Sequence, residues 1–172
     1  MIYFQLTTVA DLKEVTSISK NIQDDLLEPY ILISEEYYVY DILGDALLTE
    51  LQTQVSGNTA TGLTASTITP LNQVLLTQYI RPLAAYGAWF EYLPFSAVKT
   101  EQKGEVLQSS DNSQNATLEE LTFKRQAIKD KIQFYQDRLK SYLERNKASY
   151  PLYRSSCTPN TGSASGIFLN YR

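Results

Sequence analysis

Few side chains in this 172-residue sequence are suited to chemistry. The sequence contains no histidine, which removes the commonest general base near neutral pH, the usual catalytic triads and many zinc sites. Adjacent acidic residues occur at 24–25, 35–36 and 119–120, but neighbours on a helix point about 100° apart, so we interpret each pair as a solvated helix face. Cys157 has no histidine to activate it. The sequence therefore predicts no catalytic site, no metal site and no cofactor, and a protein that is not an enzyme.

Composition and charge limit the kinds of partner. The net charge of −4 provides no overall positive field for binding phosphate backbones or anionic lipid. Apolar runs are about four residues long, far below the ~20 that span a bilayer, and no secretion signal is expected. A single cysteine fits a reducing compartment. We expect one soluble domain made in the cytoplasm, with no membrane partner and no sequence-specific binding of DNA.

Capping residues and apolar spacing in the first third of the chain predict helices. Thr8 with Asp11 predicts a short helix over 8–16. Apolar residues at helical spacing predict a second helix over about 22–43, kinked or broken at Pro29. Gly44 is suited to a left-handed helix end, and a further helix then runs to about residue 54. Residues 56–69 are almost wholly small and polar, which predicts a loop.

The middle of the chain predicts the most buried helix. Thr69 and Pro70 form a cap and first turn, and apolar residues then recur at helical spacing up to Pro94. Pro82 lies inside this helix, and Gly87 would allow a neighbouring backbone or ring to approach closely.

A change of period after this helix predicts a small β-hairpin over about 97–108, with its turn near Gly104. Thr117 and Glu120 then form a capping box that opens the longest helix, over about 118–147, with one long apolar stripe. The fold class is therefore mainly α, a helical bundle with one small β-hairpin and an extended C-terminal arm. We expect one domain over 1–153 and the arm over 154–172.

Charge is distributed unevenly, which suggests contacts between copies. Residues 1–60 hold ten acidic and two basic residues, whereas residues 118–147 hold eight basic and five acidic residues. Opposite signs at the two ends suit a contact between different surfaces of neighbouring copies. The expected interface residues combine hairpin residues, bases of the last helix and the apolar patch of the arm: Val98, Val106, Lys124, Arg125, Lys129, Arg138, Ile167, Phe168, Leu169 and Tyr171.

Several stretches together resemble a known class of protein. They are the run QYIRPLAAYGAWFEYLPF at 78–95, KGEV at 103–106, YLERN at 142–146 and YPLY at 150–153. This pattern, over about residues 20–153, resembles small head-to-tail connector (adaptor) proteins of tailed phages, particularly the crAss-like phages of Bacteroides-like hosts.

The resemblance implies a virion structural protein of the head-tail neck. It implies a ring, commonly of about 12 copies, that docks on the portal protein and on the next neck or tail ring protein and lets DNA pass through its channel. The alternatives are a small helical protein-binding or regulatory module that works alone or as a dimer, and an enzyme without histidine. The order of rings in the neck and the face that lines the channel stay open.

Overall fold

The described part of the chain is mainly helical. A computed structural model describes residues 5–60, 68–96, 98–101, 104–107 and 118–154. Its elements in chain order are α1 (Val9–Val15), a 3-10 turn (Asp24–Leu26), α2 (Glu28–Ser34), a π-helical turn (Glu35–Tyr40), α3 (Asp41–Ala60), α4 (Pro70–Leu75), a second π-helical turn (Leu76–Ile80), α5 (Arg81–Ser96), β1 (Val98–Glu101), β2 (Gly104–Leu107), α6 (Leu118–Arg145) and a last 3-10 turn (Lys147–Ser149).

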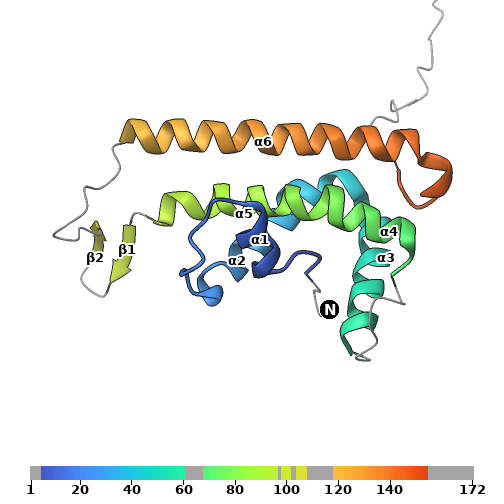
Figure 1. Cartoon of the computed structure of the whole chain (residues 1–172), viewed down its shortest axis with the longest axis horizontal. Coiled ribbons are helices and arrows are strands. Elements are labelled where there is room, and N and C mark those ends of the chain that lie inside the picture. The colour runs from blue at the N-terminus through green and yellow to red at the C-terminus, as the bar shows by residue number, and fades with distance from the viewer. Residues whose placement is uncertain (1–4, 61–67, 97, 102–103, 108–117, 155–172) are drawn as a thin grey trace, which may run out of the picture.

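Helix α5 is the centre of the fold. Figure 1 shows α6 along one side of α5, and α1 and α2 on its other side. Every residue from Leu83 to Trp89 is buried, as a helix surrounded by others requires. The prediction that this is the most buried helix is confirmed. On α6, the buried residues that face the core are Ile128, Ile132, Leu139 and Leu143.

The first helix begins as its capping signal predicts. The Thr8 hydroxyl accepts a hydrogen bond from the Asp11 backbone N–H (3.2 Å), and the Asp11 carboxylate accepts one from the Thr8 backbone N–H (2.9 Å). This reciprocal pair satisfies two amides that the first helical turn leaves without partners.

The second predicted helix begins later than expected. Residues before Glu28 form a 3-10 turn, and α2 begins at Glu28, so Pro29 lies in the first helical turn. Proline is tolerated there because the missing N–H has no partner in the first turn of a helix. The helix therefore starts one residue before Pro29 and is neither kinked nor broken there, and the predicted start at about residue 22 is wrong.

Gly44 separates two parts of α3. Its φ of 70° lies in the left-handed region, as predicted, and interrupts the helical backbone between Asp41 and Ala60. The helix then continues through Ala60, beyond the predicted end at about 54. Residues 56–60 are therefore helical, which corrects the predicted loop over 56–69; residues 61–67 lie outside the described residues.

The helical rod from α4 to α5 contains an internal proline. Thr69 caps α4 by accepting from the Asn72 backbone N–H, and Pro70 lies in the first turn, as predicted. A π-helical turn immediately precedes Pro82. In a regular α-helix the ring of Pro82 would press on the carbonyl of Gln78, and the wider π turn lies at that position.

Two short strands follow α5. β1 and β2 pair antiparallel, with Val98 opposite Leu107 and Val106 opposite Lys99. Lys103 and Gln108, which belong to the predicted hairpin, lie outside the described residues, as does Thr117 of the predicted capping box.

Candidate interaction surfaces

Basic side chains of α6 lie over aromatic rings of the helix beneath it. The pairs, with the distance from the cation to the ring centre, are Lys124–Trp89 (5.2 Å), Arg125–Phe90 (4.5 Å), Lys131–Tyr86 (4.8 Å) and Arg138–Tyr79 (4.9 Å). Three of the cations recur every seven residues, which is about two helical turns and keeps them on one flank of α6. Each contact at such exposed positions contributes about 0.5–1 kcal/mol. We call this set of four pairs the cation–ring seam.

The seam includes three of the residues predicted at interfaces. Lys124, Arg125 and Arg138 remain exposed to solvent, but their charges lie on rings of their own chain. Their interface role stays a prediction. Sequence reasoning missed Lys131, although its seven-residue spacing from Lys124 and Arg138 was available as a signal.

Tyrosine rings pack along the same helix contact. Tyr79 stacks on Tyr142 with ring centres 4.3 Å apart, and Tyr86 stacks on Tyr135 at 5.6 Å. The Tyr150 hydroxyl donates to the Leu71 carbonyl (3.1 Å). Burial and the adjacent Tyr142 hydroxyl raise the pKa of Tyr150 above its usual value, so this hydroxyl keeps its proton. Aromatic packing thereby fixes α6 and the segment after it on the rod.

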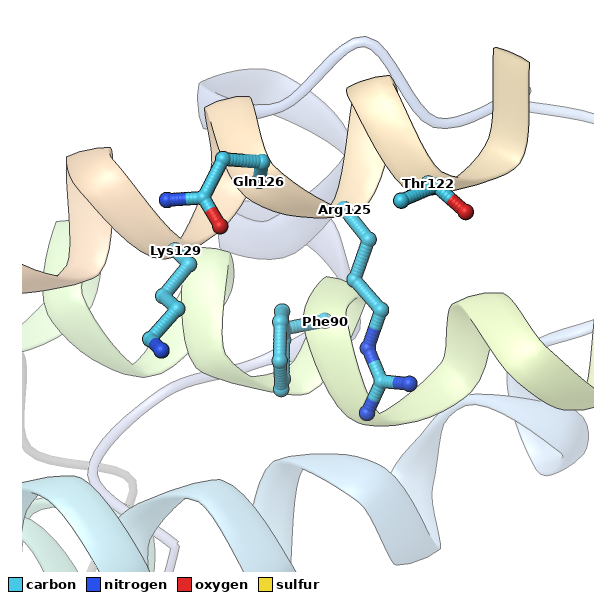
Figure 2. Close-up of a pocket in the computed structure, with 5 residues that line it drawn as sticks. All are labelled: Phe90, Thr122, Arg125, Gln126 and Lys129. Carbon is cyan, nitrogen blue, oxygen red and sulfur yellow. The ribbon is translucent and has the colours of Figure 1, made fainter. Parts of the chain in front are cut away.

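Lys129, the fourth predicted basic residue, lines a shallow pocket between α5 and α6. The pocket has a volume of about 320 Å³ and is lined by Phe90, Thr122, Arg125, Gln126 and Lys129. Figure 2 shows Arg125 and Lys129 reaching from α6 toward α5 on either side of the Phe90 ring. Two cations beside an aromatic floor give this edge of α6 a positive surface suited to acidic side chains.

The position of α2 on α5 depends on a close approach at Gly87. A Cβ atom at this position would lie 2.2 Å from Ser34 Oγ and 2.6 Å from Tyr38 Cδ2. Ser34 Oγ donates to the Ala84 carbonyl (2.8 Å) and the Tyr38 hydroxyl donates to Glu91 (2.6 Å). Burial, and then the bond to Glu91, raise the pKa of Tyr38. The prediction that Gly87 admits a neighbouring ring is confirmed.

Glu35 corrects the interpretation of the acidic pair 35–36. Glu36 is exposed as expected, but Glu35 is buried. Its carboxylate accepts from the backbone N–H groups of Leu6 (2.9 Å) and Thr7 (2.8 Å), so it holds the segment that leads into α1. The sequence offered no signal for this role, because the partners lie almost thirty residues away.

Exposed acidic residues gather on the α1–α3 part of the chain. Glu28, Glu36 and Asp41 are exposed, and of the other acids Asp24 pairs with Lys13 (2.6 Å) and Asp11 pairs with Arg81 (3.3 Å). Helix α2, which begins at Glu28, lies across α5 from α6 (Figure 1). The α1–α3 part of the chain is therefore the more acidic part of the structure.

Other predicted site residues have no described side chains. Val98 and Val106 lie in the paired strands, and only their backbone is described. Cys157 and the predicted patch of the arm lie outside the described residues, and that patch consists of Ile167, Phe168, Leu169 and Tyr171.

Most of the chain matches the model of a known protein family. Residues 39–163 match the model of DUF6712, a family of unknown function, and this range contains α5, α6 and the whole cation–ring seam. The chain belongs to this family. No curated protein matches the DUF6712 chain, and no solved structure does.

The described residues contain neither a membrane-spanning helix nor a cluster of metal ligands. In the part of the chain that the structure describes, no helix has the length and apolarity to cross a membrane. Among the same residues, no group of three or more acidic or cysteine side chains is placed to hold a metal ion.

Proposed function

We propose that this DUF6712 protein is a virion structural protein, a subunit of an oligomeric ring in the neck of a tailed phage. In this role it docks on the portal protein and on the next neck or tail ring protein, joins the head to the tail and leaves a channel for DNA. The resemblance of residues 78–95 and 142–153 to phage connector proteins suggests the class. The proposed ring has about 12 copies.

One observation carries the proposal, namely the separation of charge across the fold. Helix α2, which begins at the exposed Glu28, lies on one side of α5, and α6 with the bases of the cation–ring seam lies on the other. A ring needs a contact between two different surfaces of each copy, and opposite charges on opposite sides supply such a pair. Exposed charge pairs contribute about 0–1 kcal/mol each, so they set register more than strength.

The pair of strands and the arm give the ring its outer contacts in this proposal. A two-stranded hairpin is marginal alone, so Val98 and Val106 dock on the bundle or on another chain. The arm residues Ile167, Phe168, Leu169 and Tyr171 bury their apolar side chains on a neighbouring copy or on the portal.

The test is assembly with the portal protein encoded by the same genome. We expect the full chain, co-expressed with that portal, to purify as a complex in which electron microscopy shows a ring on the portal. A chain that stays monomeric or dimeric and never binds the portal would favour the alternative, a small helical protein-binding module. Deletion of 154–172 tests the arm: loss of portal binding without a change in the melting temperature supports docking, whereas unchanged binding contradicts it.

A further inference from the structure

Three aromatic side chains form a partly exposed cluster where α2 meets the end of α5. The ring of Tyr30 lies edge-on to that of Tyr92, with ring centres 5.4 Å apart, and its centre is 5.9 Å from that of Phe95. Tyr30 and Tyr92 are half-buried, whereas Phe95 is 61% exposed. Leu26, four residues before Tyr30, is also exposed. We call Tyr30, Tyr92 and Phe95 the aromatic cluster.

The helices beneath hold the aromatic cluster in place. Ile31, next to Tyr30, and Leu93, next to Tyr92, are both buried in the core, so the backbone that carries each ring is anchored. Rings on anchored helices lose little conformational entropy when a further apolar group covers them. Aromatic side chains exposed in this way are typical of protein interaction surfaces.

Acidic side chains exceed basic ones in the segment that leads into α2. This segment contains Asp24, Asp25 and Glu28 against one base, Lys20. Asp24 is paired with Lys13 (2.6 Å), whereas Asp25 and Glu28 are exposed. The α2 side of the aromatic cluster therefore favours an apolar partner that carries positive charge.

The C-terminal arm has the complementary composition. Residues 154–172 contain two arginines, Arg154 and Arg172, and no acidic residue. The arm also contains the apolar patch of Ile167, Phe168, Leu169 and Tyr171. Burial of apolar side chains is the main favourable contribution to most protein association, so the arm suits the aromatic cluster in both apolar character and charge.

Distance decides which copy supplies the arm. The Tyr150 hydroxyl bonds to the Leu71 carbonyl, so the arm leaves the bundle at the α4 end of the rod, far from the last turn of α5 (Figure 1). Leu71 and Phe95 are 24 residues apart along the rod, about 36 Å at the rise of a helix. Thirteen residues separate Arg154 from Ile167, and a Ser- and Gly-rich stretch of that length spans about 20 Å on average. The arm therefore falls short of the aromatic cluster of its own chain, whereas a ring can place a neighbouring cluster beside it.

We infer that residues 167–171 of one copy pack on the aromatic cluster of the next copy. Arg172, next to Tyr171, then lies toward the exposed Asp25 and Glu28. This inference rests on the proposed ring and names the surface that receives each arm.

Cross-linking between single-cysteine variants tests this contact and leaves its apolar side chains intact. In the full chain with Cys157→Ser, Ser96→Cys and Asn170→Cys are made separately, mixed in equal amounts with the portal protein present, and treated with a short bis-maleimide. We expect a covalent dimer in the mixture and none with either variant alone. Ser141→Cys, also at an exposed serine but toward the other end of the bundle on α6, is the matched control and should give no dimer with Asn170→Cys.

Removal of one ring provides a second readout. Phe95→Ser in the Ser96→Cys chain should lower the yield of mixed dimer about five- to tenfold, because it removes the most exposed ring of the aromatic cluster. Phe123→Ser in the same chain removes a ring of α6 that is 78% exposed and should leave the yield unchanged. Unchanged melting temperatures show that the variants fold.

The outcomes separate this inference from the proposed ring. An assembled ring that gives no mixed dimer, or a dimer that Phe95→Ser does not reduce, would overturn the named surface and leave the ring standing. A chain with both cysteines that forms only an internal link would also overturn it, because the arm then docks on its own chain. A chain that neither assembles nor cross-links would overturn both.

Discussion

Replacing Gly87 with alanine tests how closely α2 approaches α5. The added Cβ would lie 2.2 Å from Ser34 Oγ, whereas real Cβ atoms almost never come within 3.0 Å of such an atom. The neighbours would therefore have to move by about 0.8 Å at this point. Both are held in place, since Ser34 bonds to the Ala84 carbonyl and Tyr38 bonds to Glu91.

The expected cost follows from three contributions. Overpacking of a core contact costs about 1–3 kcal/mol, and loss of the buried Ser34 hydrogen bond costs about 1–2 kcal/mol more. Alanine is the better helix former, which returns about 1 kcal/mol. We expect Gly87→Ala to lower the free energy of unfolding by about 1–4 kcal/mol, or the melting temperature by about 2–4 °C per kcal/mol.

Urea unfolding of the full chain measures this change, and a second variant locates its origin. In a Ser34→Ala background the closest contact is absent, so the cost of Gly87→Ala should fall. An equal cost in both backgrounds would mean that Ser34 is not the obstacle. A gain in stability of about 1 kcal/mol, as helix propensity alone predicts, would refute the close approach itself.

Three other predictions concern single groups in the same half of the chain. Glu35→Ala leaves two buried backbone N–H groups without their acceptor, so it should lower the free energy of unfolding by about 2–5 kcal/mol in thermal unfolding. The exposed neighbour is the control, and Glu36→Ala should change the free energy of unfolding by no more than about 0.5 kcal/mol. Equal effects of the two variants would contradict the buried role of Glu35. Thr8→Ala removes the capping box and should cost about 0.5–2 kcal/mol, with a smaller loss of helical circular dichroism than any core variant. Tyr38 has a raised pKa, so above about pH 10 the unfolded chain loses this proton while the folded chain keeps it. Stability should therefore fall as pH rises through this range, and it should fall less steeply in Tyr38→Phe. Urea unfolding midpoints at about pH 9 and 11 measure this difference.

Local signals predicted the helix ends that depend on local chemistry. Two helix starts were predicted, one from Thr8 with Asp11 and one from Thr69 with Pro70, and the structure begins α1 and α4 at these positions. Gly44 has the positive φ that its place after an apolar helix suggests. These features need only neighbouring residues, so the sequence contains all the information that determines them.

Sequence-based predictions failed where tertiary contacts or helix continuation outweighed local preference. Residues 56–60 have a loop-like composition, yet they continue α3. Upstream in that helix, Gln54 and Glu50 both bond to Asn72 and join α3 to α4. A helix anchored in this way can extend into residues whose own propensity is poor, because adding one residue to an existing helix costs less than nucleating a new one.

The burial of Glu35 shows the same limit for the candidate site. Spacing correctly predicts that adjacent acids point in different directions, and they do so here, with Glu36 in solvent and Glu35 in the core. It does not identify which of the two enters the core. That choice depends on the backbone N–H groups of Leu6 and Thr7, which only the folded chain brings to the carboxylate.

The cation–ring seam changes what the basic residues of α6 can do. A lysine on a solvated helix samples many rotamers, so pairing it with a distant acid costs side-chain entropy and weakens the pair. Lys131 and Arg138 instead lie over Tyr86 and Tyr79, which themselves stack on tyrosines of α6. Part of the entropy cost is therefore met during folding rather than during assembly. In the proposed ring, basic side chains whose charges are already confined would lose less entropy on meeting an acidic group of the next copy, which favours one register at each contact.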